Sequence, residues 1–323
     1  MIQTLKIGDE IFFIKPSTIG TGLTLSKKKE ISKQVKDITE EQAEQDYKNL
    51  EHININEIKP STRTGNKFVD YFTFLERLDT KAKTGKTYFD FIQNKSKEIK
   101  KHYIKNLYNY YGKNINEYKK WYYIFNLYHG AISIFKPVLA MEIYYKFKPH
   151  TVLDMTMGWG GRLVGACALD VPEYIGIDMN KDLEEPYKQM TTKLKELGTK
   201  TKIKLMFQNA LNVDYSKLKY DMVFTSPPYY NIEIYKGTER MKKEQWDNEF
   251  YKPLFEKTYK YLQRNGYYIL NVPEEVYTRV CIPLLGKADI LFPLKKAERN
   301  SSISKTGNKI EINYKEYIYI WKK

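Results

Sequence analysis

The stretch Thr-Val-Leu-Asp-Met-Thr-Met-Gly-Trp-Gly-Gly-Arg at positions 151–162 decides the fold. Its first four residues predict a short buried strand that ends at Asp154. Gly158 and Gly160 let the following backbone bend tightly and approach a ligand without an intervening Cβ. The apolar run from Leu163 to Leu169 then predicts a helix, whose first N–H groups are free to bind. The Gly-x-Gly-Gly spacing differs from the three-glycine pattern of dinucleotide-binding loops.

Two more strand-and-turn units follow this turn. Tyr174–Asp178 is an apolar run that ends in an acid, and in a doubly wound sheet an acid at this point can accept from both ribose hydroxyls of a nucleoside cofactor. We therefore predict Asp178 as a ribose ligand and Met179 as a packing surface for adenine, although Asp178 also suits a helix N-cap. Lys202–Phe207 predicts a third strand, and Asn209 follows it with a side-chain acceptor.

The turn Thr-Ser-Pro-Pro-Tyr-Tyr-Asn at 225–231 follows another apolar run, 220–224. Its two prolines have no N–H to donate to a sheet, so the chain leaves the strand here. Ser226, the proline carbonyls and the ring of Tyr229 suit a planar base with an exocyclic amino group, because the amine donates to the acceptors and the base stacks on the ring. The alternative interpretation is an ordinary proline-rich turn.

The turn at 225–231 resembles the catalytic motif of amino-methyltransferases that act on DNA bases, and its serine-first form is more similar to the cytosine-N4 branch than to the adenine-N6 branch. The resemblance assigns catalysis to Ser226, Pro227, Pro228 and Tyr229. The glycine-rich turn resembles the loop of these enzymes that binds S-adenosyl-L-methionine (SAM). A Phe-x-Pro segment before the first strand is similar to one that closes over the methionine end of SAM. The implied cofactor-binding residues are Phe135, Pro137, Asp154, Met155, Gly158, Gly160, Asp178, Met179 and Asn209.

The order of these units predicts an α/β fold, a Rossmann-like SAM methyltransferase sheet with helices on both faces, plus a mainly helical, basic N-terminal region. We divide the chain into residues 1–130, which we expect to help bind DNA and recognise the target, and residues 131–323, the catalytic domain. Further strands are expected at 267–272, 288–292 and 314–321, and helices at 27–50, 89–111, 116–128, 138–147 and 244–264.

The charge of the chain indicates a polyanionic partner. It has 54 Lys and Arg against 39 Asp and Glu, for a net charge of +15. The window 81–120 has 11 basic and 3 acidic residues interleaved with aromatics, which suits phosphate contact and base stacking; the alternative explanations are a solvated helix face and an AT-rich genome. A second basic loop spans 295–309. The predicted nucleic-acid contacts are Lys95, Lys97, Lys100, Lys101, Arg299, Ser301 and Lys305.

The two cysteines, Cys167 and Cys281, lie among apolar residues and predict buried free thiols in a reducing compartment, without a metal site. No apolar run reaches membrane-spanning length, and the N-terminus lacks a signal-peptide pattern. We therefore expect a cytoplasmic protein with no membrane contact.

These observations together predict a site-specific, SAM-dependent DNA methyltransferase, of the kind found in restriction-modification systems. It would flip a base out of double-stranded DNA and methylate its amino nitrogen, with cytosine N4 favoured and adenine N6 next. Two alternatives stay open. One is an RNA base amino-methyltransferase, since tRNA enzymes share a Pro-Pro-Tyr turn. The other is a catalytically inactive methyltransferase fold that serves as a nucleic-acid-binding subunit.

Overall fold

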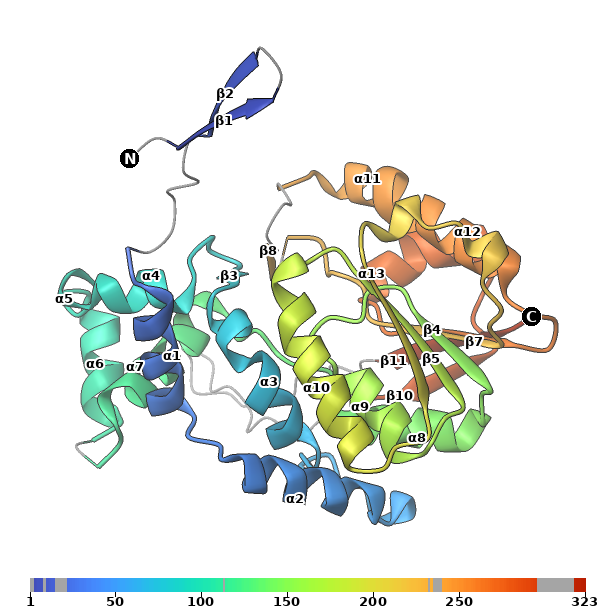
Figure 1. Cartoon of the computed structure of the whole chain (residues 1–323), viewed down its shortest axis with the longest axis horizontal. Coiled ribbons are helices and arrows are strands. Elements are labelled where there is room, and N and C mark those ends of the chain that lie inside the picture. Colours follow the sequence, from blue (N-terminus) through green and yellow to red (C-terminus); the bar gives the residue numbers. More distant parts are fainter. Residues whose placement is uncertain are drawn as a thin grey trace, which may run out of the picture.

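A computed structural model describes residues 3–7, 10–14, 22–112, 114–231, 233–234, 240–294 and 317–323. Its central element is a seven-stranded sheet with the spatial order β10-β11-β9-β7-β4-β5-β6 (Figure 1). The strands are β4 (Thr151–Asp154), β5 (Glu173–Asp178), β6 (Lys202–Phe207), β7 (Met222–Thr225), β9 (Tyr267–Leu270), β10 (Ile290–Pro293) and β11 (Tyr317–Lys322).

The strand order identifies the fold class. Strands β6, β5, β4, β7 and β9 are parallel, and numbered along the chain they run 3-2-1-4-5, the order of a doubly wound Rossmann-like sheet. The C-terminal strand β11 joins β9 and β10 by antiparallel pairing. The predicted α/β class is therefore confirmed, and the order reverses between β4 and β7.

Helices cover both faces of this sheet, because alternate strand residues point to opposite sides. Val152 and Met222 pack with α8, α9 and α10, whereas Leu153 and Val223 pack with α12 on the other face. Figure 1 shows α8, α9 and α10 on one side and α11, α12 and α13 on the other. These helices are α8 (Pro137–Phe147), α9 (Gly161–Ala168), α10 (Glu184–Glu196), α11 (Lys243–Gln245), α12 (Lys252–Tyr261), α13 (Glu274–Val276) and α14 (Ile282–Leu285), with π-helical turns at Trp246–Tyr251 and Tyr277–Cys281.

The N-terminal region is mainly helical, as predicted. Its helices are α1 (Leu25–Val35), α2 (Glu40–Glu51), α3 (Asn66–Leu78), α4 (Tyr88–Gln93), α5 (Lys95–Glu98), α6 (His102–Tyr110) and α7 (Glu117–His129), and a hairpin of β1 (Gln3–Ile7) and β2 (Glu10–Ile14) precedes them. Two expected helices were wrong in length. The helix at 27–50 is broken because Thr39 caps a new helix, and the helix at 89–111 is broken at Asn94 and again before His102.

The helical region shares its core with the sheet. One hydrophobic cluster contains Phe68 of α3 and Trp121 of α7 together with Val152 of β4. A short strand, β3 (Lys81–Ala82), pairs antiparallel with β8 (Glu233–Ile234), which follows the proline-rich turn along the chain. The helical region and the sheet are therefore in direct contact. The domain boundary at residue 130 stays a prediction.

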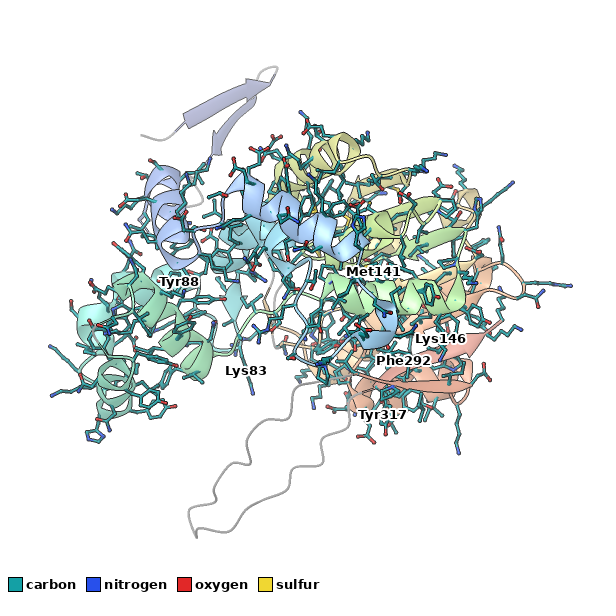
Figure 2. The ribbon with its side chains drawn as sticks, turned by 90° about the horizontal axis from the view of Figure 1, so that it is seen from below. Lys83, Tyr88, Met141, Lys146, Phe292 and Tyr317 are labelled. Carbon is teal, nitrogen blue, oxygen red and sulfur yellow. The ribbon has the colours of Figure 1, made fainter. Side chains whose placement is uncertain are left out.

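The aromatic residues of the window 81–120 differ widely in burial. Tyr88, Phe89 and Phe91 are fully buried and pack in the core of the helical region, so the expectation that they interleave with lysines on a surface was wrong. Figure 2 shows Tyr88 inside the helical region, and on the other side Lys146 of α8 beside Phe292 of β10. Tyr103 and Tyr110 are exposed.

Candidate active site

The predicted motifs meet at one edge of the sheet. Asp154, Asp178 and Thr225 are the last residues of the parallel strands β4, β5 and β7, and Asn209 follows the end of β6. In a doubly wound sheet, the crevice for ligands lies at this carboxyl edge, where the strand order reverses. Here that place is between β4 and β7.

The glycine-rich turn is held tightly against the segment before α8. Gly160 has a φ of 95° and begins α9, a conformation that L side chains rarely adopt. A Cβ at Gly161 would lie 1.8 Å from the carbonyl oxygen of Phe135, so only glycine permits this approach. The structure therefore brings Phe135 and Pro137 to the turn, as predicted from the Phe-x-Pro pattern.

The placement of Gly160 revises its expected role. A Cβ there would meet the side chain of Met190 at 2.9 Å, on the side of α10. At Gly158, by contrast, the nearest atom to an added Cβ is a backbone oxygen at 3.9 Å. Gly158 therefore faces open space that a ligand can use, whereas Gly160 serves the backbone turn and its packing on α10.

Asp178 connects the end of β5 to the glycine-rich turn. Its carboxylate accepts from the backbone N–H of Gly158 and from that of Asn180, each at 2.9 Å, one on each oxygen. Burial raises the pKa of this carboxyl to about 6, against the lowering effect of the two N–H donors. The side chain is partly exposed, and each oxygen keeps lone-pair capacity for a ribose hydroxyl. Met179 beside it is 40% exposed.

Asp154 is a supporting residue, and the prediction that it contacts the cofactor is corrected. Its side chain is fully buried, and its two oxygens accept from four donors within the protein. Arg162 donates to it at 2.7 and 3.1 Å, and Tyr174 at 2.6 Å. Burial lowers the pKa of Arg162, but the Asp154 charge outweighs it and holds that pKa above the usual value. The carboxylate thus has no oxygen left for a ligand.

The fourth donor to Asp154 reaches the proline-rich turn. The hydroxyl of Thr225 donates to Asp154 at 2.8 Å and also lies 2.6 Å from the hydroxyl of Thr156. Because Ser226 is the next residue after Thr225, this buried network joins the two turns. Met155 is another correction, since the residue is fully buried in the core on the face that packs with α12.

The Ser226 hydroxyl takes part in a short circuit of hydrogen bonds. The side-chain amide of Asn271 donates to Ser226 at 3.0 Å, and the hydroxyl of Tyr229 donates to the backbone carbonyl of Asn271 at 3.1 Å. Ser226 and Tyr229 hydroxyls lie 3.4 Å apart, a long contact. Asn271 was not predicted as a site residue, because no local motif marks it and only the pairing of β9 with β7 brings it to this sheet edge.

The second proline is held by a neighbouring tyrosine. Tyr251 donates its hydroxyl proton to the Pro228 carbonyl, and the same hydroxyl accepts from the backbone N–H of Tyr230 at 3.1 Å. Tyr230 has a φ of 52°, which turns the chain away from the sheet. The Pro228 carbonyl therefore already accepts a hydrogen bond within the protein. No donor to the Pro227 carbonyl is present among the described residues.

The remaining predicted cofactor residue lies at the rim. Asn209 is exposed at the end of β6, and its side-chain oxygen accepts from the backbone N–H of Leu211 at 2.9 Å. An amide oxygen has a second lone pair, so this contact leaves capacity for an adenine amino group.

The four lysines predicted to bind nucleic acid do not join this site. Lys95 pairs with Glu117 at 2.6 Å, and Lys101 pairs with Glu98 at 2.5 Å, whereas Lys97 and Lys100 are exposed. Helix α5 carries Lys95 and Lys97, and Figure 1 shows it at the end of the helical region that points away from the sheet. Arg299, Ser301 and Lys305 lie outside the described residues.

Both cysteines are buried and unbridged, as predicted, and burial raises the pKa of the Cys167 thiol to about 12. Within the described ranges, no group of three or more His, Cys, Asp or Glu side chains is arranged to hold a metal ion. A search of the same ranges finds no helix with the length and apolar character needed to cross a membrane.

Comparison with known proteins gives only distant similarities. No family model matches the chain, and no curated protein matches it. Among solved structures, it is similar to TrmN from Thermus thermophilus, with 14% identity over 58% of this chain and 49% of that chain and a TM-score of 0.39. A SAM-dependent O-methyltransferase from Thermotoga maritima matches with 13% identity over 62% of this chain and 70% of that chain, at a TM-score of 0.38.

A third similarity is to an rRNA methylase from Streptococcus thermophilus, with 13% identity over 59% of this chain and 99% of that chain and a TM-score of 0.37. The chain spans about half the length of the Thermus protein. Because all three TM-scores lie below 0.5, these similarities assign no activity, and the fold class rests on the strand order.

Proposed function

We propose that this chain is a SAM-dependent methyltransferase that methylates an exocyclic amino nitrogen of a flipped DNA base, with cytosine N4 favoured and adenine N6 next. One observation carries the proposal. The glycine-rich turn after β4 and the Ser-Pro-Pro-Tyr turn after β7 adjoin at the carboxyl edge of the sheet, joined through Asp154 and Thr225. Such an arrangement puts a cofactor site and a base site within reach of each other.

The residues present fit SAM. Gly158 leaves room beside the turn, Asp178 keeps acceptor capacity for the two ribose hydroxyls, and Met179 offers an exposed apolar side chain to the adenine ring. Phe135 packs edge to face on Phe224 with ring centroids 5.4 Å apart, and its carbonyl lies against Gly161 of the turn, so it would contact the methionine end of SAM. When bound, SAM would supply an electrophilic methyl group. The base nitrogen would form the new N–C bond as the C–S bond to the sulfonium sulfur breaks, with S-adenosyl-L-homocysteine as the leaving group and one proton released from the nitrogen to water.

The Ser-Pro-Pro-Tyr turn would prepare the base nitrogen. An exocyclic amine is a weak nucleophile while its lone pair is delocalised into the ring. Ser226 and the Pro227 carbonyl, accepting its two N–H groups, favour a tetrahedral nitrogen whose lone pair is free. Asn271 donates a hydrogen bond to one lone pair of the Ser226 oxygen, and the Ser226 hydroxyl can donate its own hydrogen bond to Tyr229. The second lone pair of the Ser226 oxygen is then left for the amine. The Tyr229 ring would hold the flipped base by stacking.

We also propose a role in substrate binding for the N-terminal region. Residues 1–130 would contribute to binding and recognising the nucleic acid, because β3 pairs with β8 directly after the base-binding turn, and Arg240 donates to the Lys83 carbonyl at 2.8 Å. We further propose double-stranded DNA as the substrate, a cytoplasmic location and a role of the restriction-modification kind.

Transfer of a labelled methyl group tests the proposal. Purified protein is incubated with methyl-labelled SAM and, separately, with double-stranded DNA, single-stranded DNA and RNA of mixed sequence. We expect label in DNA, and no label with the Ser226→Ala protein. Label in RNA alone would replace DNA by RNA as the substrate. SAM binding without transfer to any of them would support the inactive, nucleic-acid-binding alternative.

A further inference from the structure

Two basic side chains pair with one carboxylate where α1 and α3 meet, and two more lie on the adjoining segments 58–65 and 131–136, which touch each other because a Cβ added at Gly65 would lie 2.9 Å from Pro137. Lys36 lies 2.5 Å from Asp70, and Arg77 pairs with the other oxygen of the same carboxylate. Lys136 donates to the Pro60 carbonyl at 2.7 Å, and Arg63 is exposed nearby. The group therefore combines four positive charges with one negative charge.

The charges in this group repel one another. Burial lowers the pKa of Lys36, and the charges of Arg77 and Arg63 lower it further, against the attraction of Asp70. Burial also lowers the pKa of Lys136, and the charge of Arg63 adds to that effect. Two cations, Lys36 and Lys136, thus lie within electrostatic reach of Arg63, and Asp70 neutralises one of the four positive charges at most. A bound anion would relieve the repulsion.

A purely structural role explains only part of the group. The pairs of Asp70 with Lys36 and Arg77 fasten α1 to α3, and Arg77 is 6% exposed, so these residues suit a buried tie. Arg63 and Lys136 make no ion pair in the part of the chain that the structure describes. A purely structural role therefore leaves the positive charges of Arg63 and Lys136 without a counter-ion.

The group adjoins the candidate active site. The hydroxyl of Thr73, on α3 between Asp70 and Arg77, donates to the backbone carbonyl of Trp159 in the glycine-rich turn at 3.1 Å. On the other side, Lys136 directly follows Phe135, whose carbonyl touches Gly161. Helix α3 and the segment before α8 are therefore both in contact with the turn after β4.

We propose that Arg63, Lys136 and Lys36 bind a phosphate of the nucleic-acid backbone beside the flipped base. This inference rests on the proposed function and adds the location at which the substrate backbone lies. Arg63 is exposed and the Lys36 side chain is 33% exposed, so a phosphate oxygen can reach both. The ion pair with Asp70 holds Lys36 in place, and Arg77 fixes Asp70 through the other carboxylate oxygen. Two of the four lysines between positions 95 and 101 that were predicted for this role are instead paired with carboxylates.

The test compares two double variants that each remove two positive charges. Arg63→Gln/Lys136→Gln changes the proposed phosphate site. Lys195→Gln/Lys260→Gln is the matched control, because these exposed lysines lie near the C-terminal ends of α10 and α12, away from the carboxyl edge of the sheet. Fluorescence anisotropy with labelled single- and double-stranded DNA and RNA gives the affinity over a series of salt concentrations, calorimetry gives SAM affinity, and thermal melting reports folding.

We expect the slope of log K against log salt concentration to become shallower by roughly 1 to 2 in the first variant, since each lost phosphate contact changes it by about 0.7 to 0.9. The control should keep the wild-type slope, and both variants should bind SAM as the wild type does. A slope equal to that of the control overturns the proposal. So does a loss of SAM affinity with an unchanged slope, which would identify the anion as the cofactor carboxylate.

Two further measurements keep this inference separate from the proposed function. Arg63→Glu alone, at an exposed position, reverses one charge without changing the Lys136–Pro60 contact, and it should flatten the slope even if the double variant melts early. Methyl transfer by the wild type is measured in parallel. If the wild type transfers methyl groups while neither variant changes the slope, only the phosphate site is wrong. If the slope changes but no methyl group is transferred, only the proposed chemistry is wrong.

Discussion

The side-chain amide of Asn271 donates a hydrogen bond to the hydroxyl of Ser226 at 3.0 Å. The contact joins the end of β9 to the Ser-Pro-Pro-Tyr turn after β7, two neighbouring parallel strands. Because the Tyr229 hydroxyl donates to the backbone carbonyl of the same asparagine, Asn271 holds both residues of the turn that are proposed to contact the base.

The variant Asn271→Leu keeps the approximate volume of the side chain but removes its donor. We expect turnover to fall by roughly tenfold, the scale of a lost hydrogen bond of about 0.5–1.5 kcal/mol, while SAM affinity stays unchanged. Steady-state kinetics and calorimetry measure the two quantities. Asn49→Leu, on the exposed end of α2, is the matched control and should behave as wild type. Equal turnover in the two variants would remove Asn271 from the site.

Two variants at Tyr229 separate its ring from its hydroxyl. Tyr229→Phe keeps the ring for stacking but loses the bond to the Asn271 carbonyl and the acceptor for Ser226, so turnover should fall about 2- to 10-fold. Tyr229→Ala also loses stacking, worth about 1–3 kcal/mol, and should be slower again and bind nucleic acid more weakly. Identical kinetics in both variants would mean that the ring does not stack on the base.

Gly161→Ala tests the packing of the glycine-rich turn. Its Cβ would lie 1.8 Å from the Phe135 carbonyl oxygen, so the segment before α8 must move. We expect a loss of about 1–3 kcal/mol in the free energy of unfolding, together with weaker SAM binding. Gly198→Ala is the comparison, since its Cβ meets nothing within 4 Å and only its φ of 95° is unfavourable. It should cost less stability and leave SAM affinity intact, and the reverse order would contradict the packing.

The carboxyl of Asp178 should make SAM binding depend on pH. Burial raises its pKa from 3.8 to about 6, so the folded protein holds this proton more tightly than the unfolded chain does. Its contribution therefore favours folding at low pH and is lost as the pH rises through about 6. Ribose hydroxyls donate to the ionised form, so SAM affinity should fall as the pH is lowered below about 6. Calorimetry at several pH values should show this decline in wild type and not in Asp178→Asn.

The fold and the positions of the strand ends could be predicted from the sequence, because local patterns carry that information. A run such as Val152-Leu153 followed by an acid and glycines specifies a buried strand and a turn without reference to distant residues. The same holds for the turn at 225–231, where two prolines end a strand by themselves. The sheet edge that carries the site follows from these units alone.

The roles of single side chains at that edge could not be predicted in this way. Asp154 matches a cofactor-loop pattern, but its partners Arg162, Tyr174 and Thr225 lie on three different elements, and only their convergence shows that the carboxylate is fully occupied. Asn271 has no local pattern and becomes a candidate only when β9 pairs with β7. Likewise, composition does not show that Tyr88 is buried among helices.

The central claim is the chemistry at Ser226 and Tyr229, and the identity of the methylated nucleoside tests it most directly. Double-stranded DNA treated with the protein and SAM is digested to nucleosides and analysed by mass spectrometry, beside DNA treated with Ser226→Ala. We predict N4-methylcytosine, or N6-methyladenine as the second expectation, in the wild-type sample and neither in the variant sample. Finding 5-methylcytosine, or an equal yield of methylated base from both proteins, would contradict the account.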